Sequence, residues 1–457
     1  MKNITVGKYT LESLTTGMYI DPLILFREYI QNSTDSIDEA IRLGINTDEN
    51  SFINIIMEKE NKKIIIEDNG CGIKKNSAFK VLTDIGNSNK RHSSHKGFRG
   101  IGRLSGLSYC NKLSFETSAL NEDKKTIVTF DSLKLEELLR PGKFEEYGIE
   151  DVLAQITEVE YYEESIESHY FKVVLEGVNT KLNLLNEDKV ITYLEETAPL
   201  PYDIKKFKFG NIINNELSNI SQRIDEYNIY FKTERINKQL FKPYKRRIYV
   251  DIKKKLVDEI TDVNIKVIKN DSQDKNVALV WYGKCQLLGS IVDDRIKGLR
   301  VRKSGILIGD RFLANEIFKE DRFNGWVIGE IVILDNDIIP NARRDDFEKN
   351  DAYLFLMKEL KKIGQQISSD IRESSKKRNN NLELKTNNIK TINNKLSDKK
   401  NIRYDKEKVI IDKIDDLINK IYYKDEIIDS VNKILINNNV NNSIVEQVIK
   451  AIKKLNY

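Results

Sequence analysis

Apolar residues recur at helical spacing early in the chain and at strand spacing soon afterwards. Over residues 22–43 the apolar positions follow a period of about 3.6 residues, which predicts an amphipathic helix with Asp21 as its N-cap and Pro22 in its first turn. The segments 53–57 and 63–67 are short and rich in isoleucine, so they are expected to form a pair of β-strands. Helix and strands together predict an α+β fold for this part of the chain.

The same patterns divide the rest of the chain. Two prolines, Pro199 and Pro201, follow a predicted helix and indicate a domain boundary. Strand signals then continue to a long helix over 351–372, after which a stretch rich in Lys, Asn and Ser predicts a flexible linker. Helical periodicity returns at the end, where apolar stripes could mediate dimerisation. The expected segments are an amino-terminal domain 1–205, a middle domain 206–372, a linker 373–405 and a helical region 406–457.

Composition limits the classes of protein to consider. The 457 residues, 40% hydrophobic and 32% charged, are enough for two or three domains with their own cores. No apolar run reaches the roughly 18 residues of a membrane span and no signal-peptide core follows Met1, so we expect no membrane association and a cytoplasmic location. Three widely spaced cysteines cannot build a disulfide framework or a zinc site. The formal net charge of +4 is too small to indicate a nucleic-acid partner.

A polar stripe runs along the predicted helix 22–43. Glu28, Asn32 and Asp35 are spaced at i, i+4 and i+7, so they share one face. Two carboxylates and an amide suit Mg²⁺, with one acid left to orient a water molecule. Taken alone, this stripe is better explained as a solvated polar face.

An acidic residue and two glycines follow the second predicted strand. Asp68 ends this strand, and Gly70 and Gly72 allow a close approach of the backbone. A carboxylate in this position can accept a hydrogen bond from the amino group of a purine.

A glycine-rich segment then precedes an apolar stretch predicted to be helical. Glycines before a helix expose N–H donors in a favourable dipole, which is typical of a phosphate-binding loop. One such motif is weak evidence, but three motifs in this order and at these distances are strong. The segment consists of Gly97, Phe98, Arg99, Gly100, Ile101 and Gly102.

The three motifs resemble the nucleotide-binding motifs of the GHKL ATPases, a superfamily that includes gyrase, the ninety-kilodalton heat-shock chaperones, histidine kinases and MutL. The resemblance covers roughly the first two hundred residues, the length of one domain. It implies a Bergerat-fold two-layer α/β sandwich ATPase domain, then an αβ middle (transducer-like) domain and a small helical carboxyl-terminal region. It also implies ATP and Mg²⁺ as cofactors.

The resemblance assigns a role to each motif. It implies that Glu28 orients and activates the attacking water, that Asn32 holds Mg²⁺ and that Asp68 binds the adenine amino group. Asp35 would shape the pocket, and the loop 97–102 would bind the phosphates.

Two further segments extend the resemblance. The stretch 176–181 is similar to the late glycine–threonine element, although two residues separate Gly177 from Thr180, and it adds Thr180 to the expected ATP-binding residues. The polar stretch between 79 and 96 lies where these enzymes have their mobile ATP lid.

An arginine from the middle domain is also expected at the site. The segments 298–308 and 338–345 resemble the middle domain of the heat-shock chaperones, and this implies that Arg344, with Arg343 as its neighbour, reaches the γ-phosphate. An ion pair with Asp345 or Asp346 explains the same residue equally well.

The implied activity is Mg²⁺-dependent ATP hydrolysis that drives lid closure and clamps two subunits of a homodimer. Because the closest resemblance is to the heat-shock chaperones, we expect chaperone-like action on a protein client. The phosphate loop also resembles that of MutL, which favours an alternative: an ATP-gated DNA clamp of the MutL or MORC kind, acting in genome or phage defence. The sequence is compatible with both alternatives.

Overall fold

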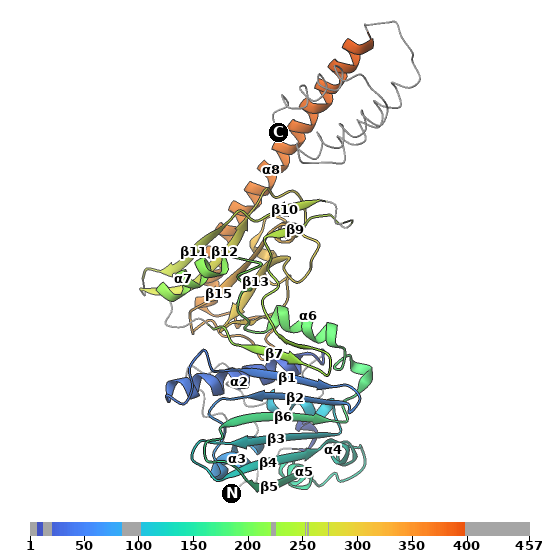
Figure 1. Cartoon of the computed structure of the whole chain (residues 1–457), viewed down its shortest axis with the longest axis vertical. Coiled ribbons are helices and arrows are strands. Elements are labelled where there is room, and N and C mark those ends of the chain that lie inside the picture. The colour runs from blue at the N-terminus through green and yellow to red at the C-terminus, as the bar shows by residue number, and fades with distance from the viewer. Residues whose placement is uncertain are drawn as a thin grey trace.

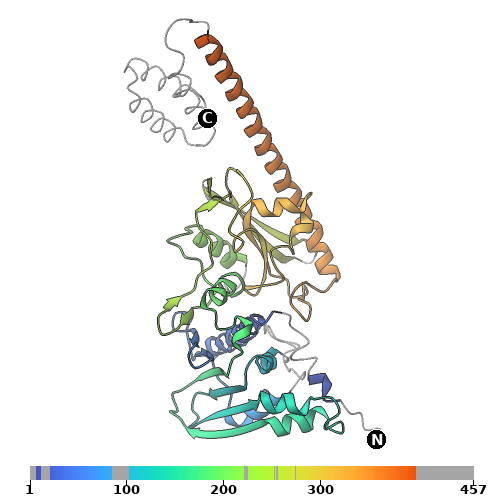
Figure 2. The same ribbon diagram turned by 90° about the vertical axis from the view of Figure 1, so that its right-hand side faces the viewer.

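The computed structural model describes residues 7–11, 21–84, 102–220, 225–251, 253, 256–272 and 274–397. Figure 1 shows two domains stacked along the long axis of the molecule, with helix α8 leaving the second domain. Figure 2 shows that this helix extends well beyond the second domain. Within the described residues, none of the helices combines the length and apolarity that a membrane crossing requires.

An eight-stranded sheet forms the centre of the amino-terminal domain, in the order β5-β4-β3-β6-β2-β1-β7-β8. Neighbouring strands are antiparallel except β1 and β7, which are parallel. The strands are β1 (Ile53–Glu58), β2 (Lys63–Asp68), β3 (Lys112–Ser118), β4 (Lys124–Asp131), β5 (Thr157–Glu163), β6 (Tyr170–Glu176), β7 (Ile229–Lys232) and β8 (Asn237–Gln239). The helices are α2 (Ile24–Arg42), α3 (Lys75–Thr83), α4 (Ser132–Leu138), α5 (Ile149–Ile156) and α6 (Glu187–Thr197), with the short 3₁₀ helices η2 (Gly102–Ser108) and η3 (Thr180–Leu182). Helices packed against a large sheet confirm the predicted α+β sandwich.

Helix α2 confirms the helix predicted over 22–43. The expected N-cap is wrong, however: the helix begins at Ile24 with Leu23 as its N-cap, and no side chain caps it. The Asp21 carboxylate instead accepts a hydrogen bond from the Leu23 N–H at 3.0 Å, one residue before the first turn. Phe26, Tyr29 and Ile30 are almost completely buried in the core between the helix and the sheet. This burial fixes which polar residues of the helix face the candidate site.

The second domain is built on a five-stranded sheet in the order β11-β12-β15-β13-β14. Its strands are β11 (Asp262–Asn270), β12 (Lys275–Lys284), β13 (Gly298–Lys303), β14 (Ile306–Leu307) and β15 (Ile328–Ile333). It also contains a two-stranded ribbon of β9 (Arg247–Tyr249) and β10 (Val257–Glu259), helices α7 (Gly210–Ile220) and α8 (Asp351–Ser397), and the 3₁₀ helices η4 (Asn315–Ile317) and η5 (Asp321–Trp326). The predicted apolar stripe of α8 packs into this core, which buries Leu356, Leu360, Ile363, Ile367 and Ile371.

The boundary expected at 205/206 does not separate the two domains cleanly. Helix α7 packs in the second domain, but β7 then pairs with β1 of the first sheet. Ile229 and Phe231 are buried in the first core because they alternate along β7 and point to its packed face. The chain therefore crosses between the domains more than once, and the prolines mark only the first crossing.

The flexible linker expected at 373–405 is wrong as far as Ser397, because α8 continues to that residue. The stretch 365–397 contains no glycine or proline, and its Lys, Leu, Arg, Gln and Glu residues have good helix propensity, so polarity alone does not end the helix. Residues 398–457, which include the predicted carboxyl-terminal helical region, lie outside the described residues.

Candidate active site

The polar stripe on α2 is buried. Glu28 is 8% exposed and Asp35 6%, while Asn32 is half-buried. A solvated polar face does not fit this burial, since carboxylates are costly to bury without partners. The stripe therefore belongs to an internal site.

The first and third motifs meet at Glu28. A Cβ atom on Gly102 would lie only 2.5 Å from Glu28 Oε2, so a larger residue here would force the Glu28 side chain to move. Gly102 begins the 3₁₀ helix η2 instead of the predicted α-helix. The Tyr29 hydroxyl ties η2 to α2, since it donates to the Arg103 carbonyl and accepts from the Gly106 N–H, both at 3.0 Å. The rest of this motif, Gly97, Phe98, Arg99, Gly100 and Ile101, lies outside the described residues.

Asp68 presents a carboxylate that is only partly satisfied. It is 1% exposed, and its Oδ1 accepts a hydrogen bond from the Gly70 N–H at 2.9 Å. Its Oδ2 is buried and has no hydrogen-bond partner among the described residues. Burial raises the pKa of Asp68 to about 7, although the nearby Ser33 hydroxyl, the Gly70 N–H and the Ser36 hydroxyl lower it. A buried acceptor without a partner indicates a place where a ligand can donate a hydrogen bond.

The two glycines after Asp68 hold this turn in place. A Cβ on Gly70 would collide with Ser36 of α2, with its hydroxyl oxygen only 2.1 Å away. Gly72 has φ +62° and leaves no room for a Cβ beside the Ser118 carbonyl. Only glycine is tolerated at both positions, so the turn carries Asp68 against α2.

His169, not Thr180, lies at the Asp68 end of the sheet. Phe171 pairs with Asp68 in the register of β6 and β2, and His169 Nδ1 is 2.9 Å from the Gly70 carbonyl oxygen. Thr180 is exposed and follows the opposite end of β6, where the neighbouring Val178 N–H bonds to Lys62. At about 3.3 Å per residue, these two ends are separated by roughly 17 Å. The structure therefore does not bring Thr180 together with the other predicted residues.

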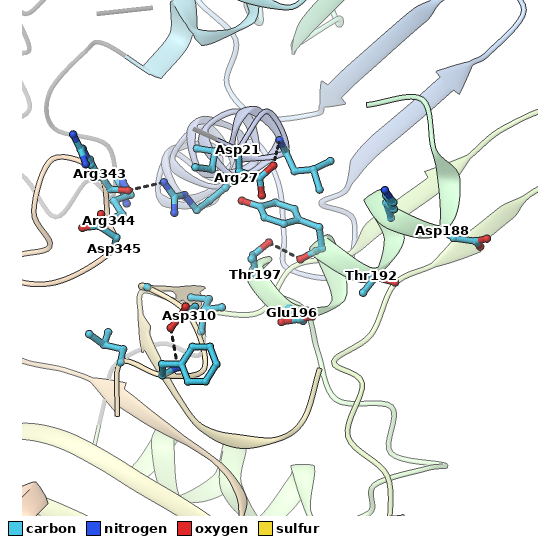
Figure 3. A pocket seen from close by; sticks show the side chains of 18 residues that line it. Asp21, Arg27, Asp188, Thr192, Glu196, Thr197, Asp310, Arg343, Arg344 and Asp345 are labelled. Carbon is cyan, nitrogen blue, oxygen red and sulfur yellow. Dashed lines mark hydrogen bonds between the residues drawn. The ribbon is translucent and has the colours of Figure 1, made fainter. Parts of the chain in front are cut away.

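Two arginine side chains lie beside Glu28 at the boundary between the domains. The guanidinium of Arg27 lies 3.2 Å from Glu28 Oε1 and also donates to the Arg343 carbonyl at 3.1 Å. Figure 3 shows this second bond between α2 and the loop of the second domain. Arg344 Nε is 3.7 Å from the same Glu28 oxygen. The candidate base thus lies between a cation from its own helix and one from the other domain.

The backbone holds Arg344 in an uncommon conformation. Arg344 has φ +57°, its N–H donates to the Asn341 carbonyl, and its carbonyl accepts from the Gly309 N–H at 2.8 Å. The acids of the alternative interpretation have other contacts: Asp345 accepts from the Asn341 side chain at 2.6 Å, and Asp346 pairs with Lys349 at 2.8 Å. Left-handed backbone in a residue other than glycine is costly and is often found at functional sites.

A cleft of about 890 Å³ lies between the two domains beside these arginines. Its walls come from the start of α2, from α6 and from loops of the second domain (Figure 3). Asn32 and Asp68 do not line this cleft, so it is distinct from the end of the site where Asp68 is expected to bind the purine. Its lining includes Arg27, Arg343 and Arg344, so a change in domain orientation would alter this cleft and the surroundings of Glu28 together.

Sequence reasoning missed two residues of this site. Arg27 is adjacent to Glu28, and an arginine on the buried side of a predicted helix was a signal of a partner acid. No pattern in the sequence indicated His169, because its position depends on the pairing of β2 with β6.

Part of the chain is similar in sequence to known proteins. Residues 25–148 match a family model described as histidine kinase-, DNA gyrase B- and HSP90-like ATPase. The similar curated proteins include the chaperone protein HtpG of Acinetobacter baylyi, 30% identical over 125 residues, which are 23% of this chain and 20% of that protein. HtpG of Alkaliphilus metalliredigens is 27% identical over 188 residues, 37% of this chain and 30% of that protein.

The longest of these matches reaches beyond the family model. HtpG of Shouchella clausii is 24% identical over 227 residues, which are 42% of this chain and 35% of that protein. The chain thus spans about a third or less of the length of these relatives. The similarity therefore describes a domain and leaves the activity of the whole chain to be proposed.

Proposed function

We propose that the whole chain binds ATP with Mg²⁺ and hydrolyses it, a proposal supported by the match of residues 25–148 to the histidine kinase-, DNA gyrase B- and HSP90-like ATPases. The contact between Arg344 and Glu28 across the domain boundary carries this proposal, because it joins a candidate base to a cation from the second domain. A site completed by two domains can couple hydrolysis to their relative movement.

The adenine would bind at Asp68. The unpartnered Oδ2 of this carboxylate supports an acceptor role toward the exocyclic amino group, and burial would strengthen that hydrogen bond. His169 would form part of the same end of the site through its contact with Gly70. Asp35, buried one helical turn beyond Asn32, would shape the wall of the pocket.

Asn32 would supply the protein ligand of Mg²⁺. No cluster of three metal-binding side chains occurs in the described part of the chain, and Mg²⁺ bound to a nucleotide requires none. Such an ion usually takes one or two side-chain oxygens together with phosphate oxygens and water. The half-buried amide of Asn32, one turn from Glu28, fits this pattern. When bound, Mg²⁺ would neutralise charge on the phosphates.

Arg344 would exchange partners during the cycle. In the structure its guanidinium lies against Glu28, where it would compete for the carboxylate that would activate water. A γ-phosphate carries more negative charge than one carboxylate, so it would draw Arg344 away and leave Glu28 able to orient water. Arg344 would then stabilise the charge that develops on the transferred phosphoryl group.

The similarity to HtpG chaperones supports chaperone-like action on a protein client, driven by lid closure and clamping of two subunits. We propose a homodimer, for which the carboxyl-terminal region 406–457 is the sequence candidate. Light scattering tests this assembly, and a monomeric mass for the full chain would contradict it. The alternative of an ATP-gated DNA clamp predicts ATP-dependent binding of DNA.

Substitution of Glu28 tests the proposed hydrolysis. Glu28→Ala should still bind ATP, because the proposed contact between adenine and Asp68 remains. Its turnover should fall at least about a hundredfold, as expected for the loss of a general base. Calorimetry of nucleotide binding and release of phosphate would measure the two effects separately. Glu163→Ala, on the exposed edge strand β5, is the matched control and should behave like the wild type. Undiminished turnover in Glu28→Ala would remove Glu28 from the mechanism.

A further inference from the structure

Two segments that are distant in the sequence form one basic surface on the second domain. Lys205, Lys206 and Lys208 precede α7, and a second group surrounds β9. The two segments lie side by side, since the Arg246 N–H donates to the Lys206 carbonyl at 3.1 Å. All the charged residues of this surface are exposed. We call it the ribbon surface, and it consists of Lys205, Lys206, Lys208, Lys245, Arg246, Arg247 and Lys253.

Most of these cations have no acidic partner within ion-pair distance among the described residues. Asp203 pairs with Lys206 at 2.7 Å, and Glu259 pairs with Arg246 at 2.6 Å. Lys245 interacts electrostatically with Asp293, but Arg295 already forms an ion pair with that carboxylate at 2.8 Å. Five exposed cations therefore have no ion-pair partner among the described residues, namely Lys205, Lys208, Lys245, Arg247 and Lys253.

An aromatic ring lies among these charges. Arg247 and Tyr249 are two residues apart on β9, so their side chains share one face about 6.6 Å apart along the strand. Ile248 between them points to the other face and is 3% exposed, whereas Tyr249 is 47% exposed. The ribbon lies at the end of the second domain that faces away from the eight-stranded sheet (Figures 1 and 2). It is therefore accessible independently of the proposed ATP site.

We propose that the ribbon surface binds single-stranded nucleic acid. The five cations would contact backbone phosphates, and the ring of Tyr249 would stack on a base. A duplex offers no free base face to this ring, and lysine is depleted at protein–protein interfaces, so neither a duplex nor an acidic protein fits as well. The proposal does not depend on ATP hydrolysis.

Binding of a fluorescent 20-nucleotide single strand of mixed sequence, followed by anisotropy over a series of KCl concentrations, tests the proposal in the full-length protein. Five phosphate contacts predict a slope of about −3.5 for log affinity against log salt, since each contributes about −0.7 on a single strand. Lys245→Glu/Arg247→Glu should weaken binding at least tenfold and reduce the slope to about −2. Tyr249→Leu should weaken binding about fivefold or more without changing the slope.

A matched control uses two exposed lysines of the first domain. Lys59→Glu/Lys134→Glu changes the net charge equally and should leave binding unchanged. Wild-type affinity in the ribbon variant, with its circular dichroism spectrum preserved, would overturn the proposal. Tighter binding of a duplex of equal length, or full displacement of the strand by polyglutamate at equal charge, would also overturn it. The ribbon variants should hydrolyse ATP at the wild-type rate, so a failure here is separable from a failure of the proposed ATPase.

Discussion

Glu28 lies between two guanidinium groups, and this pairing decides how the proposed site can operate. Arg27 approaches it from the same helix at 3.2 Å and Arg344 from the second domain at 3.7 Å. All three side chains are largely buried, so their mutual attraction is stronger than that of a surface pair. A ligand that takes Arg344 therefore changes the surroundings of the carboxylate as well as the contact between domains.

Asp68 gives the site a dependence on pH. Because burial raises its pKa to about 7, the carboxyl is mostly protonated at pH 6 and mostly ionised at pH 8. Only the ionised form offers both oxygens as acceptors. The affinity for adenine should therefore be about tenfold weaker at pH 6 than at pH 8. Calorimetry with adenosine measures this without phosphate groups that titrate in the same range. Asp68→Asn should bind weakly at both pH values, and a wild-type affinity that did not change with pH would contradict the base contact.

Single residues could be predicted where their chemistry and spacing formed a motif. Glu28, Asn32 and Asp68 satisfy that condition, and the structure places them on α2 and at the end of β2 as expected. Thr180 was selected by likeness of sequence, but the register of β6 with β2 puts it at the wrong end of the strand. His169 is found only through that register, since nothing local distinguishes it.

At the scale of elements, a buried charge cluster joins the two domains. Glu330 of β15 is completely buried and accepts from Lys242 at 3.1 Å and from the Tyr202 hydroxyl at 2.8 Å. It also pairs with Arg302, which donates to the Glu196 carbonyl at the end of α6. Burial opposes its charge, but these partners lower the pKa of Glu330 to about 2. Its contribution to stability is thus present above pH 4.5 and is lost as the pH falls toward 2.

Substitution of Glu330 should therefore destabilise the protein strongly. Glu330→Gln leaves the buried Arg302 without its counter-charge and leaves Lys242 with only the more distant Glu226 at 3.6 Å. Breaking a buried ion pair in this way typically costs about 3–5 kcal/mol. The exposed pair of Lys124 and Glu163 serves as the control, since Glu163→Gln should cost no more than about 1 kcal/mol. Urea unfolding at pH 7 compares them. Equal losses of unfolding free energy in the two variants would show that the cluster does not stabilise the contact between the domains.

Elements with strong periodicity were predictable, and those that depend on distant pairing were not. Helix α2, strands β1 and β2 and the apolar stripe of α8 follow from local pattern. Strand β5 is a polar edge strand whose sequence resembles an acidic loop, and β7 joins the first sheet only because β1 offers a parallel edge. Helix α8 extends to Ser397 because the residues of this polar segment have sufficient helix propensity. Its polar composition alone had predicted a linker.

At the scale of the whole molecule, the arrangement of charge matters more than its sum. A formal net charge of +4 gives no indication of a partner, yet folding gathers seven cations from two segments into the ribbon surface. In the same way, the proposed active site depends on a residue more than three hundred positions from Glu28 in the sequence. Neither arrangement could be derived without the fold, although the likeness to known middle domains had pointed to Arg344.

The turnover of Arg344→Ala tests the central claim most directly, namely that the second domain completes the ATP site. An arginine that meets charge developing in the transition state lowers the barrier more than it tightens binding, so kcat should fall roughly 10³-fold with KM nearly unchanged. Arg343→Ala is the matched control, because Arg27 bonds to the Arg343 backbone carbonyl, which the substitution keeps. A variant that loses stability but retains its kcat would contradict the account, since Arg344 would then be a structural ion-pair partner of Glu28 and nothing more.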